Sequence, residues 1–267
     1  MVFSHDMDDL RETAGAQSLR RALQLLRLLA DHQEQGVRLT QVMAATGLQR
    51  STAHRLLSCL VEERFAERAV HDKAYRLGVN AMQLGFAAMR RLPLADTCRP
   101  LMQRLARISG DTVFLVIREG DYCLCLHREE GHFPVKVFTT DVGDRRLLGL
   151  GAGGLALMAD LADAEVERIF DRHVPEYAQA GFSRERLLQA VRGTRSRGYA
   201  DIVDTLTVGV SGVGMAFAAA PGTPAAISLG AITPRLPEQR KQELAQLLMA
   251  QMPPDATGER LRSPAAM

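Results

Sequence analysis

Residues 39–57 read LTQVMAATGLQRSTAHRLL, and this stretch determines how the first part of the protein folds. Thr40 can cap a short helix, because its hydroxyl accepts hydrogen bonds from the free N–H groups of a first turn. Gly47 follows, and a glycine can adopt the positive φ that a sharp turn requires. A longer helix over residues 49–63 comes next. The stretch therefore predicts two helices joined by a tight turn.

The flanking segments extend this pattern. From Ser18, apolar residues recur at three- and four-residue spacing, which predicts a helix that ends near Gly36. Two strand-like pieces over residues 65–69 and 74–77 come after the two-helix stretch, and residues 80–90 have a helical pattern. The order helix, helix, turn, helix, hairpin is that of a winged helix-turn-helix.

Charge is unevenly distributed. Between Ser18 and Leu92 there are twelve basic and six acidic residues, a net charge of +6, whereas the net charge of the whole sequence is only +2. A basic segment on a mildly acidic body favours a polyanionic partner for that segment. The alternative is a generally arginine-rich composition, because the sequence has only three lysines.

The polar side of the helix that begins near Gln49 has the chemistry of a DNA-reading surface. Arg50 and Arg55 can bind guanine edges or phosphates through two N–H groups at once. Phosphate contacts elsewhere would position the helix without reading sequence. A purely structural three-helix bundle is the alternative. The candidate DNA-binding residues are Arg50, Ser51, Thr52, His54, Arg55, Arg68, Lys73, Arg76, Arg20 and Arg21.

The second part of the sequence predicts an α+β domain with a mostly antiparallel sheet. Strand-like segments cover residues 112–118, 122–127, 135–138, 210–217 and 225–231, and helical segments cover 95–108, 153–160, 164–170, 183–196 and 237–252. Residues 205–234 carry no charge and are long enough to span a membrane. Residues 221–224 read PGTP, which is turn chemistry. We therefore expect two buried strands and no membrane partner.

Residues 47–57 resemble the recognition helix of IclR-family transcriptional regulators. Tyr75-Arg76-Leu77-Gly78 is similar to the end of that family's wing, Arg197-Gly198-Tyr199-Ala200 to an element before its last strands, and Ala225-Ala226-Ile227-Ser228-Leu229 to a core strand. The resemblance covers roughly residues 18–250. It implies a winged helix-turn-helix (18–79), a linker helix (80–92) and a GAF-like effector-binding domain (93–252). Residues 1–17 and 253–267 have no hydrophobic periodicity, so we expect flexible tails there. The resemblance also implies a homodimer or homotetramer, usually a repressor, on a partly palindromic operator of double-stranded DNA.

The glycine-rich run over residues 149–154 matches G-x-G-x-x-G, the pattern of a dinucleotide-binding turn. A nucleotide-dependent enzyme is therefore the alternative function. That motif should directly follow a buried strand, whereas two adjacent arginines stand just before this run. A second interpretation is an anion site built on free N–H groups at a helix start. A third is that the glycines serve packing alone.

The resemblance assigns a carboxylate-binding effector pocket to this region. It implies backbone contacts from Gly151, Ala152 and Gly153, a hydroxyl from Ser228, and neighbouring positions at Asp201 and Gly212. The sequence departs from the family pattern, which often has His at Gly149 and Lys at Leu155. Family members that bind small keto acids have an acid at the position of Ile202 and a Cys at the position of Gly212. Because these replacements are less polar, we expect an organic acid larger than a two- or three-carbon one.

The remaining composition favours no other class. Four cysteines without a C-x-x-C pair, and no secretory leader, predict a reduced, cytoplasmic protein. Cys123 and Cys125 are two apart in a predicted strand and could be redox-active or metal-binding, but buried structural thiols are favoured. The seven histidines have no metal-ligand spacing, and no catalytic motif occurs, so we expect neither a metal, nor a cofactor, nor catalysis.

Overall fold

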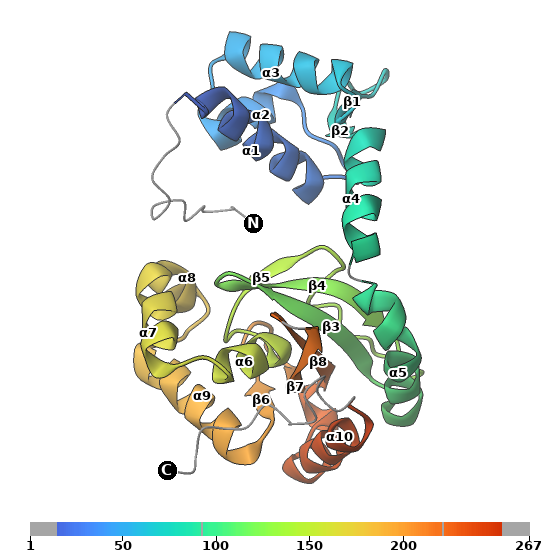
Figure 1. The fold of residues 1–267 in the computed structure, drawn as a ribbon, viewed down its shortest axis with the longest axis vertical. Helices are drawn as coiled ribbons and strands as arrows, with labels where there is room; N and C mark the ends of the chain where they lie inside the picture. The colour runs from blue at the N-terminus through green and yellow to red at the C-terminus, as the bar shows by residue number, and fades with distance from the viewer. Residues whose placement is uncertain (1–14, 92, 221, 253–267) are drawn as a thin grey trace. The chain divides into compact units, whose positions relative to one another are not determined.

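The computed structural model describes residues 15–91, 93–220 and 222–252. The protein forms two compact units that divide between residues 93 and 94, and each is described by itself (Figure 1). Of the tails predicted at 1–17 and 253–267, residues 1–14 and 253–267 lie outside the described residues. Among the helices that the structure describes, none is long and apolar enough to cross a membrane.

The N-terminal unit has the predicted order of elements. Three helices, α1 (Gln17–Asp31), α2 (Leu39–Thr46) and α3 (Arg50–Glu62), precede a hairpin of β1 (Ala66–Arg68) and β2 (Tyr75–Leu77), and α4 (Val79–Arg91) follows. The helices pack against one another because each buries one apolar face. The shared core consists of Leu25, Leu29, Val37, Val42, Ala53, Leu57, Leu60, Ala66 and Tyr75.

Two backbone features fix the turn and the hairpin of this unit. Gly47 has a φ of +67° and ends α2 with an N–H that donates to the Met43 carbonyl at 2.9 Å. Val37 pairs with Tyr75 in an antiparallel bridge, with N–H···O distances of 2.9 and 2.8 Å in the two directions. The segment before α2 is therefore tied directly to the wing.

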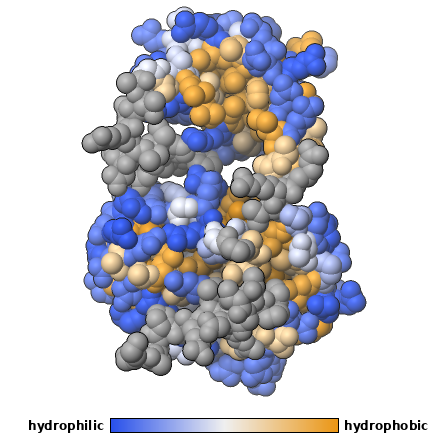
Figure 2. All heavy atoms as spheres, in the orientation of Figure 1, coloured by the Kyte–Doolittle hydropathy of each residue, from blue (hydrophilic) through white to orange (hydrophobic). Residues whose placement is uncertain are grey.

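Hydrophobic side chains also reach the surface of the N-terminal unit (Figure 2). On α4, Val79, Met82 and Phe86 are spaced as one helical stripe and are exposed to 45%, 55% and 58%. On α1, Leu19 and Leu23 are exposed and lie one turn apart. Both faces therefore leave a large part of these apolar side chains exposed.

The C-terminal unit is built on a six-stranded antiparallel sheet of order β5-β4-β3-β8-β7-β6. The strands are β3 (Thr112–Glu119), β4 (Tyr122–Glu129), β5 (Arg145–Leu147), β6 (Ala200–Val203), β7 (Val210–Ala220) and β8 (Thr223–Ile232). The uncharged run of the sequence forms β7 and β8, as predicted, and these strands lie inside the sheet.

Helices cover both faces of this sheet (Figure 1). On one face lie α5 (Leu94–Ser109) and α10 (Glu238–Gln251), which pack on strand residues such as Leu115 and Ile227. On the other face lie α6 (Ala152–Ala159), α7 (Asp163–Arg172), α8 (Val174–Gln179) and α9 (Arg184–Arg197), which pack with Val116 and Ala226. Alternate residues of each strand thus serve two separate cores.

The strand predicted at residues 135–138 is wrong. These residues belong to the connection between β4 and β5, where Pro134 has no N–H to give to a sheet. Val137 is buried, but Phe138 is exposed and lies under the Arg128 guanidinium, 4.5 Å from the ring centre. These apolar residues therefore anchor the loop between β4 and β5 and do not form a strand. The short elements β5, β6 and α8 were not predicted.

The first turn of α6 lies directly on the sheet because glycines remove the side chains between them. A Cβ placed on Gly153 would come within 2.8 Å of Val116 Cγ2 on β3. A Cβ placed on Gly214 of β7 would come within 2.9 Å of the backbone carbonyl group of Ala152. Real Cβ atoms do not approach other atoms this closely, so a larger residue at Gly153 requires Val116 or α6 to shift, and one at Gly214 requires a shift of the α6 backbone or of β7.

We therefore predict opposite effects for two glycine substitutions. Gly214→Ala overpacks the α6 contact and lowers the free energy of unfolding by about 1–3 kcal/mol. Gly85→Ala lies in α4 with nothing within 4 Å of the new methyl, so it raises stability by about 0.5–1 kcal/mol through helix propensity. Urea unfolding followed by circular dichroism measures both, and equal effects would contradict the packing argument.

Candidate functional sites

The polar face of α3 is exposed at its amino-terminal half. Arg50 and His54 lie one turn apart, as do Ser51 and Arg55, and all four side chains are exposed, whereas Thr52 is half-buried. The opposite face holds Ala53 and Leu57, both fully buried. The exposed face of α3 thus presents two adjacent rows of hydrogen-bonding side chains. Its apolar face packs into the core of the N-terminal unit.

The other candidate DNA-binding residues of the hairpin differ in how they are placed. Lys73 is exposed in the hairpin turn with a φ of +56°, and Arg68 stacks on the Tyr75 ring with 5.5 Å between its guanidinium carbon and the ring centre. Arg76 is half-buried, because its guanidinium donates to the Gln35 carbonyl at 3.0 Å and pairs with Asp72 at 3.3 Å. Arg76 therefore links the hairpin to the segment before α2 and stabilises the hairpin turn. Its pairing with Asp72 leaves less positive charge for a partner.

Arg20 and Arg21 lie near the start of α1 and are half-buried. They follow the first helical residue, Gln17, by three and four positions. Both arginines therefore belong to the same N-terminal unit as α3.

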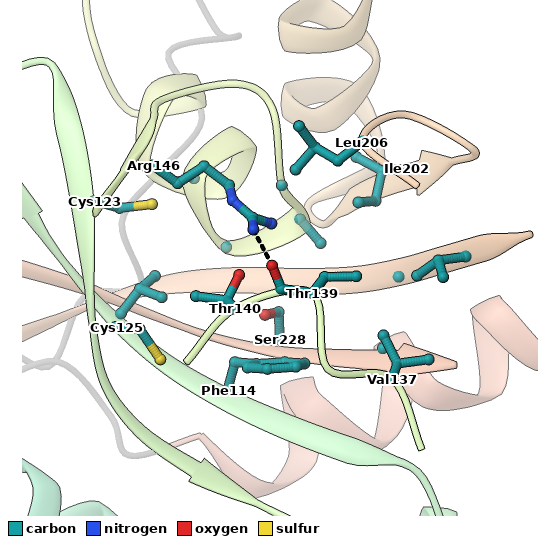
Figure 3. A pocket seen from close by; sticks show the side chains of 18 of the residues that line it. Phe114, Cys123, Cys125, Val137, Thr139, Thr140, Arg146, Ile202, Leu206 and Ser228 are labelled. Carbon is teal, nitrogen blue, oxygen red and sulfur yellow. Dashed lines mark hydrogen bonds between the residues drawn. The ribbon is translucent and has the colours of Figure 1, made fainter. Parts of the chain in front are cut away.

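A cavity lies in the C-terminal unit where the start of α6 meets the sheet (Figure 3). About 660 Å³ of empty space lies within it, a figure that includes the solvent at its open mouth. Phe114, Val137, Ile202 and Leu206 contribute apolar surface, while Thr139, Thr140, Asp144, Arg146, Ser211 and Ser228 contribute polar groups. Strands β3, β4, β7 and β8 and the loop between β4 and β5 all supply lining residues.

Five of the six predicted effector-site residues lie together at this cavity: Gly151, Ala152, Gly153, Gly212 and Ser228. Gly151 precedes the first residue of α6, and that helix start has no side-chain cap. The Ser228 hydroxyl lies 3.4 Å from the position that a Cβ on Gly153 would occupy. The first N–H groups of α6 and a serine hydroxyl therefore occur at one end of one cavity.

Asp201 is the exception, and its assignment to the cavity is corrected. Its carboxylate binds Lys241 of α10, with the ammonium nitrogen 2.9 Å from Oδ1 and 3.1 Å from Oδ2. In β6, neighbouring side chains point to opposite faces, so Ile202 lines the cavity and Asp201 faces α10. Asp204 is also engaged elsewhere, since its Oδ1 accepts from the Gly209 N–H at 2.9 Å and from the Thr233 hydroxyl at 2.7 Å.

Sequence reasoning missed Arg146, the positively charged residue among those that line the cavity. Its side chain leaves β5 and points into the cavity, where it donates to the main-chain carbonyl of Thr139 (Figure 3). Burial lowers the pKa of this guanidinium, although an arginine remains charged near neutral pH. The adjacent arginines 145 and 146 were a usable signal, because in a strand one of them must face inward.

The two thiols of the cavity wall are buried. Burial raises the pKa of Cys123 to about 11 and the pKa of Cys125 to about 12. Both side chains are therefore protonated thiols near neutral pH and not reactive thiolates. Among the described residues, no group of three or more His, Cys, Asp or Glu side chains could hold a metal ion.

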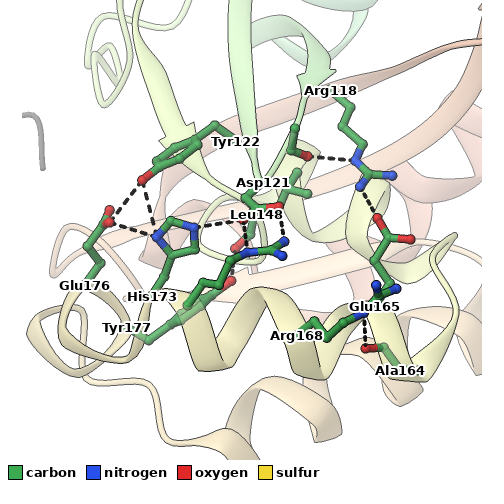
Figure 4. A network of polar contacts seen from close by, with 12 residues as sticks. Arg118, Asp121, Tyr122, Leu148, Ala164, Glu165, Arg168, His173, Glu176 and Tyr177 are labelled. Atoms are coloured by element: carbon green, nitrogen blue, oxygen red, sulfur yellow. Dashed lines mark hydrogen bonds and ion pairs between the residues drawn. The ribbon is translucent and has the colours of Figure 1, made fainter. Parts of the chain in front are cut away.

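A separate polar network ties α7 and α8 to the hairpin of β3 and β4 (Figure 4). His173 is 2% exposed, with Nε2 2.9 Å from Asp121 and Nδ1 3.0 Å from Glu176. Arg172 binds the same Asp121 through two nitrogens at 2.7 and 2.8 Å. Burial raises the pKa of Asp121, but hydrogen bonds from Arg172 and His173 outweigh it and hold this pKa below its usual value. Asp171, two residues before His173, pairs with Arg184 and lies outside this network.

Two family descriptions match the protein in consecutive segments. The IclR helix-turn-helix domain matches residues 18–69, and the bacterial transcriptional regulator IclR C-terminal domain matches residues 86–252. The chain belongs to the IclR family of transcriptional regulators. The second match begins within α4, shortly before the division of the structure into two units.

Curated relatives of this family are similar to the protein over part of its length. The HTH-type transcriptional regulator BhcR of Paracoccus denitrificans is 33% identical over 59% of this chain and 56% of its own length. The transcriptional repressor IclR of Escherichia coli K12 is 26% identical over 70% of this chain and 69% of its own length. The match to BhcR thus spans little more than half of that relative.

Solved structures show the same fold. A putative IclR transcriptional regulator from Silicibacter sp. TM1040 has a TM-score of 0.73 at 20% identity, covering 88% of this chain and 92% of that one. An IclR homologue from Microbacterium hydrocarbonoxydans, solved with 4-hydroxybenzoate, has a TM-score of 0.72 at 21% identity, covering 87% and 96%.

Because Asp201 pairs with Lys241, we predict that its substitution lowers the stability of the protein. Asp201→Asn leaves the Lys241 ammonium, whose side chain is only 8% exposed, with a weakened partner, and the free energy of unfolding falls by about 2–3 kcal/mol. Asp96→Asn is the control, since its pair with Arg99 is solvent-exposed and contributes little. Urea unfolding compares the two variants. Altered effector selectivity with unchanged stability would return Asp201 to the cavity.

Proposed function

We propose that this protein is a repressor that binds an operator through α3 and releases it in response to an organic acid in the C-terminal cavity. The proposal rests chiefly on the exposed basic face of α3. Arg50 and Arg55 protrude there while Ala53 and Leu57 anchor the helix. A helix of this kind fits the major groove, where guanidinium groups read guanine edges.

The flanking basic residues supply the sequence-independent part of this interaction. Lys73 and Arg68, exposed on the hairpin, are suited to phosphate contacts beside the groove. Arg20 and Arg21 are further candidates on α1. Arg76 contributes to the hairpin's own structure, because it is paired with Asp72.

A homodimer or homotetramer supports the same function. The stripe of Val79, Met82 and Phe86 on α4 and the exposed leucines of α1 are apolar surface that a second copy can cover. Two copies related by a two-fold axis then match a partly palindromic operator.

The effector is proposed to be an acid larger than two or three carbons. The N–H groups of Ala152 and Gly153 and the Ser228 hydroxyl suit a carboxylate, and the apolar wall suits a hydrocarbon or aromatic body. The neighbour from Microbacterium hydrocarbonoxydans was solved with 4-hydroxybenzoate, which makes that compound a reasonable probe. An effector changes operator affinity only by binding the DNA-competent and incompetent states unequally.

The glycine-rich run gives no comparable support to a nucleotide-dependent enzyme. It joins β5, an edge strand in an antiparallel sheet, to α6, whereas the dinucleotide fingerprint follows a strand of a parallel βαβ unit. Gly149 takes the positive φ of the turn, and Gly153 and Gly154 let α6 approach the sheet. The comparisons offer no support for this alternative either.

Replacing Arg50 tests the DNA-binding role. Arg50→Ala weakens binding to the DNA upstream of the protein's own gene by about 1–3 kcal/mol, roughly 5- to 150-fold, because a bidentate base contact is lost. Its melting temperature stays close to wild type, since Arg50 is exposed. Fluorescence anisotropy with specific and scrambled duplexes measures the loss.

The matched control is Arg168→Ala, which removes the same charge from α7 in the other unit. Operator affinity should then be nearly unchanged. Loss of folding in Arg50→Ala with intact DNA affinity would show that α3 is misassigned.

Oligomerisation gives a separate prediction. The double substitution Met82→Glu and Phe86→Glu places two charges in the α4 stripe and should convert the protein to a smaller oligomer by light scattering. Gln83→Glu, an exposed position of the same helix, is the control and should leave the mass unchanged. An unchanged mass in the double variant excludes this stripe as the interface.

A further inference from the structure

Arg146 is half-buried and differs from the buried charges of the C-terminal unit. Within the part of the protein that the structure describes, it makes no ion pair, and its one hydrogen bond goes to the Thr139 carbonyl. Asp111, by contrast, is paired with both Arg235 and Arg240, and Lys241 is paired with Asp201. A charge withdrawn from water normally acquires a partner of opposite sign.

The guanidinium lies beside the start of α6. A Cβ placed on Gly151 would be 3.7 Å from Arg146 Cδ and 3.9 Å from Nη1. The uncapped N–H groups of Ala152 and Gly153 begin at the same point. Two sources of positive potential thus meet at one end of the cavity, and both suit an anion.

The cavity has one carboxylate near Arg146, that of Asp144, and its negative charge favours the charged guanidinium without a direct ion pair in the described part of the chain. Asp144 lines the cavity, but it is exposed, and its Oδ2 already accepts from the Asp141 N–H at 2.8 Å. No ion pair joins it to Arg146 among the described residues. Away from Arg146, apolar side chains predominate on the wall: Phe114, Val137, Ile202, Leu206 and Val210.

We infer that Arg146 is the specificity-determining residue of the cavity and pairs with the acid group of an effector whose body is apolar. This inference rests on the proposed effector function and adds the residue that selects an acid over its neutral analogue. The planar guanidinium can bind a carboxylate through two parallel N–H···O bonds. The N–H groups of α6 add to this pairing. The apolar wall receives the hydrocarbon or aromatic part of the ligand.

Arg146 also has a structural contact, so the test must separate the two roles. Its hydrogen bond to Thr139 holds the loop between β4 and β5 over the cavity. If Arg146 acted only through that loop, its removal would weaken acids and their neutral analogues equally. If it pairs with the acid, its removal weakens the acids alone.

The experiment is calorimetric titration of the full-length protein with benzoate, 4-hydroxybenzoate, phenylacetate and octanoate, each beside its matched amide. Wild type should bind at least one acid tenfold or more tightly than its amide. Arg146→Met should lose that acid by tenfold or more, which brings the acid-to-amide ratio close to one. Arg146→Lys should recover part of the preference, because it restores the charge without the bidentate geometry.

Arg145→Met is the matched control. Arg145 is the preceding residue of β5, and it points away from the cavity to pair with Glu119 at 2.8 Å and to stack on Tyr122. This variant should keep the wild-type preference. Melting temperatures of all four proteins check that each is folded.

The inference is overturned if Arg146→Met keeps the acid preference, if acids and amides lose affinity equally, or if no acid in the panel binds wild type. Operator binding by the same preparations is measured by gel shift. Retained operator binding with a failed acid preference overturns Arg146 alone. Absent operator binding with a clear acid preference overturns the repressor function and leaves Arg146 as the acid-binding residue.

Discussion

The C-terminal unit depends on one close contact, between the first turn of α6 and the strands beneath it. Gly153 and Gly214 remove the side chains that would separate the two backbones. The helix start therefore lies among Ser228, Ile202 and Arg146. Because protein interiors are close-packed, a displaced α6 would move the cavity with it. The same contact forms the covered face of the sheet and the cavity proposed as the ligand site.

In the N-terminal unit, the two faces of α3 have different roles. Ala53 and Leu57 fix α3 in the core, which leaves Arg50 and Arg55 available for a partner. A small molecule bound in the other unit changes DNA affinity only as far as it prefers one conformational state. A tenfold change in operator affinity requires a coupling free energy of about 1.4 kcal/mol. A tenfold difference between the affinities of the two conformational states for one acid supplies this coupling free energy.

The sequence predicted most of this architecture where elements are long and strongly patterned, as in α1, α3, β7 and β8. It failed at short elements. β5 has three residues and β6 four, too few for a pattern of alternation to be recognised. The consequence was an error in the site itself. Had β6 been predicted, alternation would have turned Ile202 inward and Asp201 outward, and the same reasoning in β5 would have separated Arg146 from Arg145. The apolar residues near 137 were misread because a loop over a cavity buries side chains as a strand does.

The residues that line the cavity also favour a larger ligand over a small one. An acid of two or three carbons would satisfy Arg146 and the α6 N–H groups but leave the wall formed by Phe114, Val137 and Leu206 against water. Covering that wall with a ring or an alkyl group adds affinity in proportion to the apolar area removed from water, at about 25 cal/mol for each Å². The pairing with Arg146 selects the acid, and the apolar wall selects its length. Because the two requirements lie at different parts of one cavity, only a molecule that carries both groups satisfies the site.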